Sequence, residues 1–542
     1  MSSQTTANVL SEFDICLAVT QQAINSQMAY AWKSWKQRND FKGTFEDTVN
    51  IFKKQKVKGG DVVDSKSGID ATFAPLEVNL AVQNVNLGQV EVKLTMTSGT
   101  VKYFVEGCPA DPYNFKNVSI TFRVNLEKSP CKLDDLKVIE PNGHKVAEAT
   151  IKESGLPESV FSIEYLFLKF TDIDFEIIEA ISFENGAPVD AVTVASKALT
   201  LLLHGDLAPG GKDVSKFILG TVVRRNMEEA TPTFAMTDFI FDVSPNFNAV
   251  SASTLNYLGV FNKKALPPDR DTARLKLRNP WVQPSQIDGS EASIAGVMAI
   301  CKEKFFDNYM MGEFTKTLGN YLKSKPNIVG LKCKFESEEV NQSQSFSDFL
   351  GNISIAKDIA SLASYGNYKI DSTTNFSLDI QIIPYSDNLN ISGRINLFIH
   401  GYEVDILDNF GFNRESYVEL SGSCKIIGQG AGSNFSLSTH LTYNFGTPNV
   451  TKNDNYGYGV DKLSSDVFTW GKMNEAVETI AKTLGEKVEH RISEYLDSSL
   501  STLSIQLTQH KFIPPGTSVF TFQKPIFTSA GDLLMEVIYK AP

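Results

Sequence analysis

The sequence is poor in the residues that build metal centres and disulfide frameworks. Its 542 residues include six cysteines and six histidines. The cysteines are dispersed and no CxxC spacing occurs, so neither a structural zinc site nor a dense disulfide scaffold is expected. We predict free buried thiols, with a bridge between Cys108 and Cys131 as the alternative. Asp172 and Asp174 stand two apart without a third ligand, and we predict no metal site and no cofactor.

Positive charge and long apolar runs are also scarce. Lys and Arg number 51 against 63 Asp and Glu, a formal net charge of −12. This acidic balance opposes binding of the protein as a whole to nucleic acid, and the lysine-rich residues 53–60 fit a solvated loop. No stretch approaches the ~20 apolar residues that span a bilayer, and the N-terminus lacks the features of a signal peptide. We therefore expect a soluble protein that is cytoplasmic as synthesised, whose release would need a non-classical secretion route.

Catalytic signatures are absent as well. Residues 204–211 resemble an oxyanion loop but have no accompanying GxSxG elbow, and a plain turn is the better interpretation. The glycine-rich residues 428–433 run into a strand instead of opening a helix, which disfavours phosphate binding. A hydrolase would have four histidines at its disposal, namely His400, His440, His490 and His510. Because no recognisable nucleophile or carboxylate pair accompanies them, we expect a binding protein and not an enzyme.

The sequence does contain apolar residues at helical spacing. Hydrophobic residues make up 42% of the chain, enough for substantial cores. Apolar positions recur at steps of three and four in residues 9–35, 294–322 and 473–496, which predicts three long amphipathic helices. Their apolar faces contain the residues that we expect to line a hydrophobic groove: Phe13, Leu17, Ile24, Met28, Met298, Phe305 and Tyr309.

Between these segments the apolar residues alternate with a period of two. The alternation covers much of residues 76–126, 376–406 and 435–443, and it is typical of antiparallel sheets with one buried face. Residues 191–204 fit either a helix or a buried strand. Residues 262–290 are rich in proline and charge and are the best candidate for a linker. We therefore divide the chain into two pseudo-repeated halves, 1–285 and 286–542, each with a helix and a large sheet.

Three stretches carry a family resemblance. They are the opening "FDICLAVTQQAINSQM", "STLNYLGV" at 253–260, and the tail "IPPGTSVFTFQKPIF" that leads into "LLMEVIYK". In them the chain resembles the tubular lipid-binding (TULIP) superfamily, and within it the clostridial forty-seven-kilodalton protein and OrfX family. Members of that family are encoded beside botulinum neurotoxin genes and related insecticidal toxin genes. The resemblance implies an α+β fold in which long amphipathic helices are wrapped by highly curved antiparallel β-sheets.

The resemblance also implies a function. It favours a non-enzymatic bacterial protein that binds a lipid or another hydrophobic ligand, associated with a toxin or insecticidal system. The alternative is an accessory protein that assembles with toxin components through protein contacts and holds no lipid. Toxin components and a membrane surface are further candidate partners. An apolar helix face suits an open tunnel and a filled core equally well, so its spacing does not distinguish them.

Overall fold

The computed structural model is described for most of the chain. The described residues are 10–34, 40–46, 66–82, 89–106, 108–139, 141–154, 157–169, 176–179, 183, 186–203, 216–225, 236–277, 281–287, 294–318, 322, 324–345, 368–403, 411–429, 436–447, 449–453, 505–506, 511–513 and 519–540. Within them, no helix is long and apolar enough to cross a membrane.

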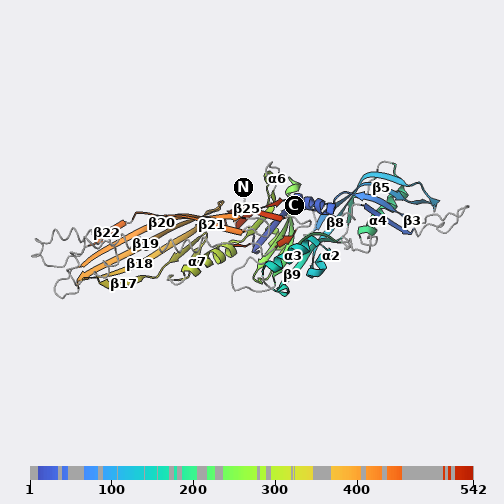
Figure 1. Cartoon of the computed structure of the whole chain (residues 1–542). Coiled ribbons are helices and arrows are strands. Elements are labelled where there is room, and N and C mark those ends of the chain that lie inside the picture. Colours follow the sequence, from blue (N-terminus) through green and yellow to red (C-terminus); the bar gives the residue numbers. More distant parts are fainter. Residues whose placement is uncertain are drawn as a thin grey trace, which may run out of the picture.

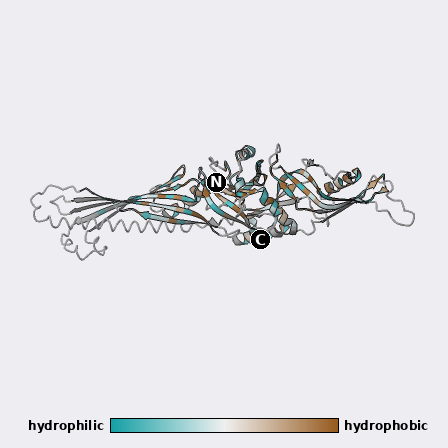
Figure 2. Ribbon diagram, turned by 90° about the horizontal axis from the view of Figure 1, so that it is seen from above, coloured by the Kyte–Doolittle hydropathy of each residue, from teal (hydrophilic) through white to brown (hydrophobic). Residues whose placement is uncertain are grey.

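Three antiparallel sheets follow one another along an elongated molecule, as Figure 1 shows. The central sheet has six strands and lies between two sheets of nine strands each. Figure 2 shows hydrophilic and hydrophobic residues alternating along many of the strands. The predicted antiparallel alternation is therefore confirmed, whereas the balance between strand and helix lies much further toward strand than we expected.

The central sheet joins distant parts of the chain. Its strand order is β12-β13-β1-β14-β26-β25, and every neighbouring pair is antiparallel. The strands are β1 (Ile15–Thr20), β12 (Met236–Ser244), β13 (Thr254–Phe261), β14 (Ile294–Ile300), β25 (Val519–Phe527) and β26 (Leu533–Lys540). β13 and β14 are buried along their entire length, because both faces of this sheet are covered.

Two of the predicted long helices are wrong in their first parts. Residues 294–300 form the buried strand β14, and residues 15–20 form β1, so helix α1 covers only Gln21–Ser34. Apolar side chains of β1 alternate between the large core cluster, which receives Ile15 and Val19, and a second cluster, which receives Cys16 and Ala18. A strand buried on both faces reads as a continuous apolar run, and such a run satisfies helical spacing by accident.

The second sheet is built from residues between β1 and β12 of the central sheet, together with β24, which precedes β25. Its main order is β2-β3-β5-β8-β9-β11-β24, with β4 paired to β5 and β10 paired to β8. The bounds are β2 (Asp40–Glu46), β3 (Lys66–Phe73), β4 (Glu77–Asn79), β5 (Gln89–Lys102), β8 (Tyr113–Cys131), β9 (Phe161–Lys169), β10 (Glu176–Glu179), β11 (Lys216–Arg225) and β24 (Lys511–Ile513). A separate pair, β6 (Phe104–Val105) and β7 (Cys108–Pro109), follows β5.

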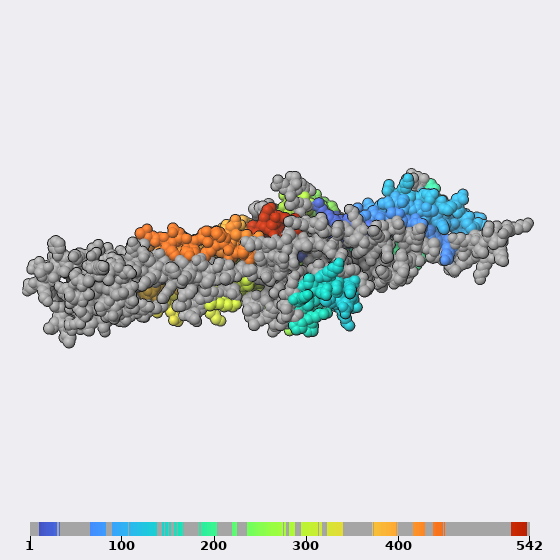
Figure 3. Space-filling view, viewed as in Figure 1, coloured from blue at the N-terminus to red at the C-terminus, as the bar shows by residue number. Residues whose placement is uncertain are grey.

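Helices cover parts of this second sheet. α4 (Val189–Leu203) contacts β2, β3 and β5. Of the ambiguous residues 191–204, those up to 203 are therefore helical, and residue 204 lies outside the described residues. Two further helices, α2 (Leu133–Ile139) and α3 (Pro141–Ser154), pack on Ile163 and Val223. They project from the middle of the molecule (teal in Figure 3). The short helix η2 (Glu158–Val160) follows them in the chain. α1 is tied to β4 by Asn25, whose side chain exchanges two hydrogen bonds with the backbone of Val78 at 2.8 and 3.0 Å.

The third sheet forms one end of the molecule. Its main order is β15-β16-β18-β19-β20-β21-β23, with β17 paired to β18 and β22 paired to β20. The bounds are β15 (Asn327–Val329), β16 (Lys332–Glu336), β17 (Val340–Ser345), β18 (Tyr368–Ile382), β19 (Asn388–Glu403), β20 (Gly411–Gln429), β21 (Ser436–Phe445), β22 (Asn449–Asn453) and β23 (Ile505–Gln506).

The proline-rich segment predicted as a linker contains packed structure. It includes helices α5 (Arg270–Leu275) and α6 (Pro284–Ile287), and its apolar residues Ala273, Leu277 and Val282 are buried in the second core cluster. Because the central sheet takes strands from both sides of residue 285, the predicted halves share one sheet. The division into 1–285 and 286–542 stays a prediction, and the predicted helix 473–496 lies outside the described residues.

Candidate binding site

A small apolar pocket lies where the helical segment after β14 meets the third sheet. It contains about 180 Å³ of empty space, part of it open to solvent. Two groups of residues line it, one from the helical segment and one from strands β20 and β21: Phe305, Tyr309, Met310, Ile426, Leu437, Ser438 and Thr439. The surface that faces the pocket is apolar, although three of the lining residues, Tyr309, Ser438 and Thr439, also carry hydroxyl groups.

The helical side of the pocket has an unusual backbone. Residues Glu303–Met310 form a π-helix, η5, which continues into the α-helix α7 (Met311–Leu318). At its end the N–H of Met311 donates to the carbonyl of Phe306, five residues earlier. Phe305 and Met310 are also five residues apart, so the wider turn brings both side chains to the same face. π-Helical turns are rare and occur frequently at functional sites, which makes this wall a candidate for binding.

Contacts on both sides hold this helical segment between two sheets. The backbone N–H of Lys302 donates to the side chain of Asp532, just before β26, at 2.9 Å. The ring of Phe305 lies 6.1 Å from that of Phe527 in the central sheet, measured between centroids. The ring of Phe314 lies 5.3 Å from that of Phe335 in the third sheet. The pocket is therefore fixed at the junction of these two sheets.

The strand side of the pocket continues as an apolar track. β20 and β21 are antiparallel, and Ile426 pairs with Thr439, Cys424 with Leu441, Gly422 with Tyr443 and Leu420 with Phe445. Alternate residues of a strand share a face, so the lining residues Leu437 and Thr439 share theirs with Leu441, Tyr443 and Phe445. These last three are half-buried and pack against the main core cluster. We call Leu420, Gly422, Cys424, Leu441, Tyr443 and Phe445 the apolar track.

One ion pair lies on the helical segment that forms the pocket. Lys302 Nζ is 2.6 and 2.8 Å from the two carboxylate oxygens of Asp307. Burial raises the pKa of Asp307, and the hydrogen bonds from Lys302 partly offset that shift. Along the track, burial raises the pKa of the Cys424 thiol to about 12, so this thiol is protonated at neutral pH and contributes as an apolar group.

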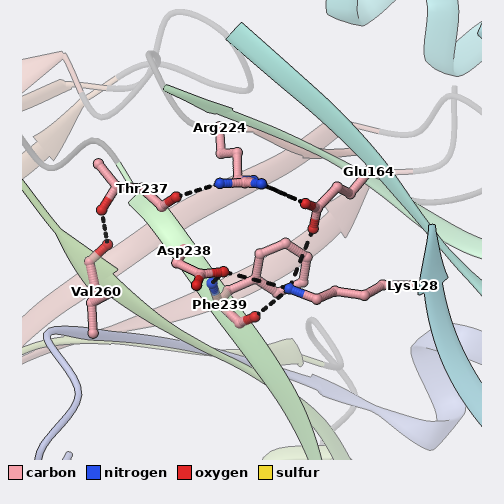
Figure 4. A network of polar contacts seen from close by, with 7 residues as sticks. All are labelled: Lys128, Glu164, Arg224, Thr237, Asp238, Phe239 and Val260. Atoms are coloured by element: carbon pink, nitrogen blue, oxygen red, sulfur yellow. Dashed lines mark hydrogen bonds and ion pairs between the residues drawn. The ribbon is translucent and has the colours of Figure 1, made fainter. Parts of the chain in front are cut away.

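A cluster of charged residues lies elsewhere, between the second and central sheets (Figure 4). Glu164 on β9 accepts from Arg224 Nε at 3.0 Å and from Nη2 at 2.7 Å, and its other oxygen is 3.4 Å from Lys128 Nζ. The two cations also donate to backbone carbonyls of β12, Arg224 to Thr237 and Lys128 to Phe239, each at 2.7 Å. Because the charged groups of this cluster pair with one another and with β12, we assign it a structural role: it connects the two sheets and is not a reaction centre.

The structure disperses the residues that we predicted for the groove. Phe305 and Tyr309 line the pocket. Ile24 and Met28 on α1 are buried in the main core cluster, as is Met298, whose strand partner is the half-buried Leu17. Phe13, expected on a helix, instead precedes β1 and lies in the second cluster. Leu17 and Met298 likewise lie on strands, so their helical placement was wrong. Whether any of these residues binds a ligand stays a prediction.

Other sequence expectations have mixed outcomes. All six cysteines are free, although Cys108 is exposed and Cys131 and Cys301 are only partly buried. In the described part of the chain, no group of three or more His, Cys, Asp and Glu side chains is placed to hold a metal ion. His440 lies exposed on β21, whereas His490, His510, Asp172 and Asp174 fall outside the described residues. The sequence pattern had identified β21 as a strand, but it gave no sign that its apolar face meets Phe305.

Comparison with known proteins finds similarity among solved structures. No protein-family model matches the chain, and neither does any curated protein. Among solved structures it is similar to P47 of Clostridium botulinum E1, at 10% identity and a TM-score of 0.47, over 97% of this chain and 99% of that one. It is also similar to a lipopolysaccharide binding protein, at 11% identity and a TM-score of 0.27, again over 97% and 99%. Both of these proteins have TULIP-type folds, the superfamily that the sequence resembles.

Proposed function

We propose that the protein binds the hydrocarbon chain of a lipid or similar amphiphile at the pocket between η5 and β21. The observation that carries this proposal is the π-helical wall of Phe305, Tyr309 and Met310, which lines a small apolar cavity together with Ile426 and Leu437. We further propose that the bound chain continues from the pocket along the apolar track.

The size of the pocket sets what it can hold. Its cavity volume is about 10 Å³, far below the ~300–1,000 Å³ of typical ligand pockets. The pocket therefore takes the end of a chain only when the side chains of its lining move apart, and it does not take a whole lipid. Each methylene group removed from water contributes ~0.8 kcal/mol, so a chain gains affinity in proportion to the length that it lays on the track. The half-buried Tyr443 and Phe445 provide such a surface at the far end of β21.

The same lining argues against catalysis in the pocket. It contains hydroxyl groups but neither histidine nor carboxylate, and a hydroxyl without a neighbouring base is a weak nucleophile. We therefore retain a non-enzymatic binding role as the proposal. The sequence resemblance also implies that the protein is bacterial and associates with components of a toxin or insecticidal system. This association stays a prediction.

Two neighbouring substitutions test the proposal. Thr439→Phe adds a ring to the pocket lining, whereas His440→Phe adds a similar ring to the exposed face of the same strand. Dansylated undecanoic acid, whose fluorescence rises on transfer to an apolar site, is titrated into each purified full-length protein. We expect saturable binding by the wild type and by His440→Phe, and on the order of 10-fold weaker binding by Thr439→Phe, since overfilling a packed site costs ~1–3 kcal/mol.

The titration has a clear negative outcome. If the three proteins bind the fatty acid with equal affinity, the bound chain does not lie in the pocket. If the wild type shows no saturable binding, the proposal is wrong. In that second case the assembly alternative gains ground, and it predicts purified protein free of extractable lipid. Thermal melts of both variants establish that a lost fluorescence signal does not reflect unfolding.

A further inference from the structure

We propose that the β12–β13 loop is a membrane-contact surface that inserts Phe247 and Val250 into the interface of a zwitterionic phospholipid bilayer. Phe247 is 52% exposed and Val250 is 42% exposed, although both are large apolar residues. They lie three residues apart in the connection that includes the short helix η4 (Val250–Ala252). This inference concerns a different part of the molecule from the pocket and does not depend on what the pocket holds.

The loop presents these side chains from an ordered backbone. The side-chain oxygen of Asn246 accepts from the backbone N–H groups of Asn248 and Ala249, at 3.2 and 3.1 Å. The N–H of Asn246 donates to the hydroxyl of the buried Ser253 at 2.9 Å. Residue 253 also accepts, through its carbonyl, from the N–H of Gln21 at the start of α1 at 2.7 Å. Phe247 is therefore exposed on a loop whose backbone is held by hydrogen bonds. Insertion into a bilayer requires little further ordering of that loop.

Charge favours a lipid interface as the partner. η4 contacts both α1 and α6. Residues 15–32, 243–262 and 281–287 contain no charged residue, in a chain where 21% of residues are charged. The described residues that are exposed on these segments are all uncharged: Gln22, Ser26, Phe247, Asn248, Val250, Asn262 and Ser285. Glu536 is buried near α6, where it forms an ion pair with Lys524 and accepts hydrogen bonds from the side chains of Gln523 and Gln286.

A neutral surface can approach lipid headgroups without removing a charge from water, which would be costly. The rest of the protein carries a net charge of −12 and is repelled by anionic lipids, so zwitterionic lipids are the favoured partner. Two inserted side chains bury less apolar area than one acyl anchor does. The contact is therefore weak and reversible, of the kind that lets a protein visit a membrane and leave it.

Co-sedimentation of the full-length protein with phosphatidylcholine vesicles at millimolar lipid tests the inference. We expect part of the wild type to sediment, Phe247→Asp to partition on the order of 10-fold less, and Phe247→Trp to partition at least as well as wild type. Val329→Asp is the matched control, because Val329 is 68% exposed on β15 of the third sheet. Raising the salt concentration should leave the wild-type partition unchanged, since no ion pair is involved.

Three results would overturn the inference. They are a wild type that stays in the supernatant at every lipid concentration, a Phe247→Asp variant that sediments like wild type, and a partition that requires anionic lipid and disappears with salt. Thr439→Phe separates this site from the pocket. It should bind vesicles as wild type does while losing the dansylated fatty acid, so either proposal can fail alone.

Discussion

Glu164 shows how single residues decide the arrangement of the sheets. Its side chain is 7% exposed and is shared by Arg224 and Lys128. Both cations reach past it to carbonyls of β12, the edge strand of the central sheet. Those carbonyls would otherwise be open to pairing with another chain. The cluster therefore covers a sheet edge and fixes the second sheet against the central one.

Replacing Glu164 by Gln should destabilise the protein strongly. The substitution keeps the shape but removes the anion of Arg224 and leaves Lys128 with Asp238 alone, at 3.5 Å. Breaking a buried ion pair costs ~3–5 kcal/mol. Because Arg224 and Lys128 are partly exposed, we expect about 3 kcal/mol, measured as the free energy of unfolding in urea. The control is Glu336→Gln, which removes an exposed ion pair with Lys334 on β16. It should leave the unfolding midpoint unchanged, and a similar loss in both variants would contradict the role given to Glu164.

The sequence carried part of this information at the scale of residues. Phe305 and Tyr309 were predicted for the groove because they share a helical face, and both line the pocket. Glu164 and Arg224 are 60 residues apart on strands that pair, so no local pattern connects them. Leu437 was recognisable as a core residue of the predicted strand at 435–443, whereas Ile426 was not singled out. Their approach to Phe305 depends on how a sheet and a helix from different parts of the chain pack.

At the scale of elements, the exposed sheets were predictable and the buried one was not. β5, β8, the end of β18 (378–382) and much of β21 alternate between a buried and a more exposed face, and this period of two is visible in the sequence. β1 and β14 are covered on both sides, which removes the alternation. The apolar run in β14 then merged with the genuine helical spacing of η5 and α7 into one apparent helix.

Two glycines test the corrected assignment of this region. A Cβ added to Gly296 in β14 would collide with the carbonyl oxygen of Ala18 in β1. Gly296→Ala should therefore lower the free energy of unfolding by at least about 2 kcal/mol. A Cβ at Gly312 in α7 meets no atom within 4 Å, so Gly312→Ala should stabilise the protein by up to about 1 kcal/mol. Stabilisation by both changes would fit the single helix that the sequence suggested and would contradict β14.

At the scale of the whole molecule, three sheets arranged end to end meet at two junctions. The joint of Glu164 connects the second and central sheets, and the helical segment with Phe305 and Phe314 connects the central and third sheets. The central sheet takes its strands from the beginning, the middle and the end of the chain. Strand pairing between such distant segments produces no periodic pattern in the sequence. The sequence therefore suggested two halves and gave no indication of the sheet that they share.

The central claim is that a hydrocarbon chain lies in the pocket at the second junction and along the apolar track. The most direct measurement is photo-crosslinking of the full-length protein with a fatty acid that carries a diazirine at its methyl end, followed by mass spectrometric mapping of the adducts. We predict adducts in Phe305–Met310 and in β20 and β21, which excess unlabelled fatty acid competes away and Thr439→Phe reduces. Adducts spread over the surface, or concentrated on α1 and insensitive to Thr439→Phe, would contradict the account.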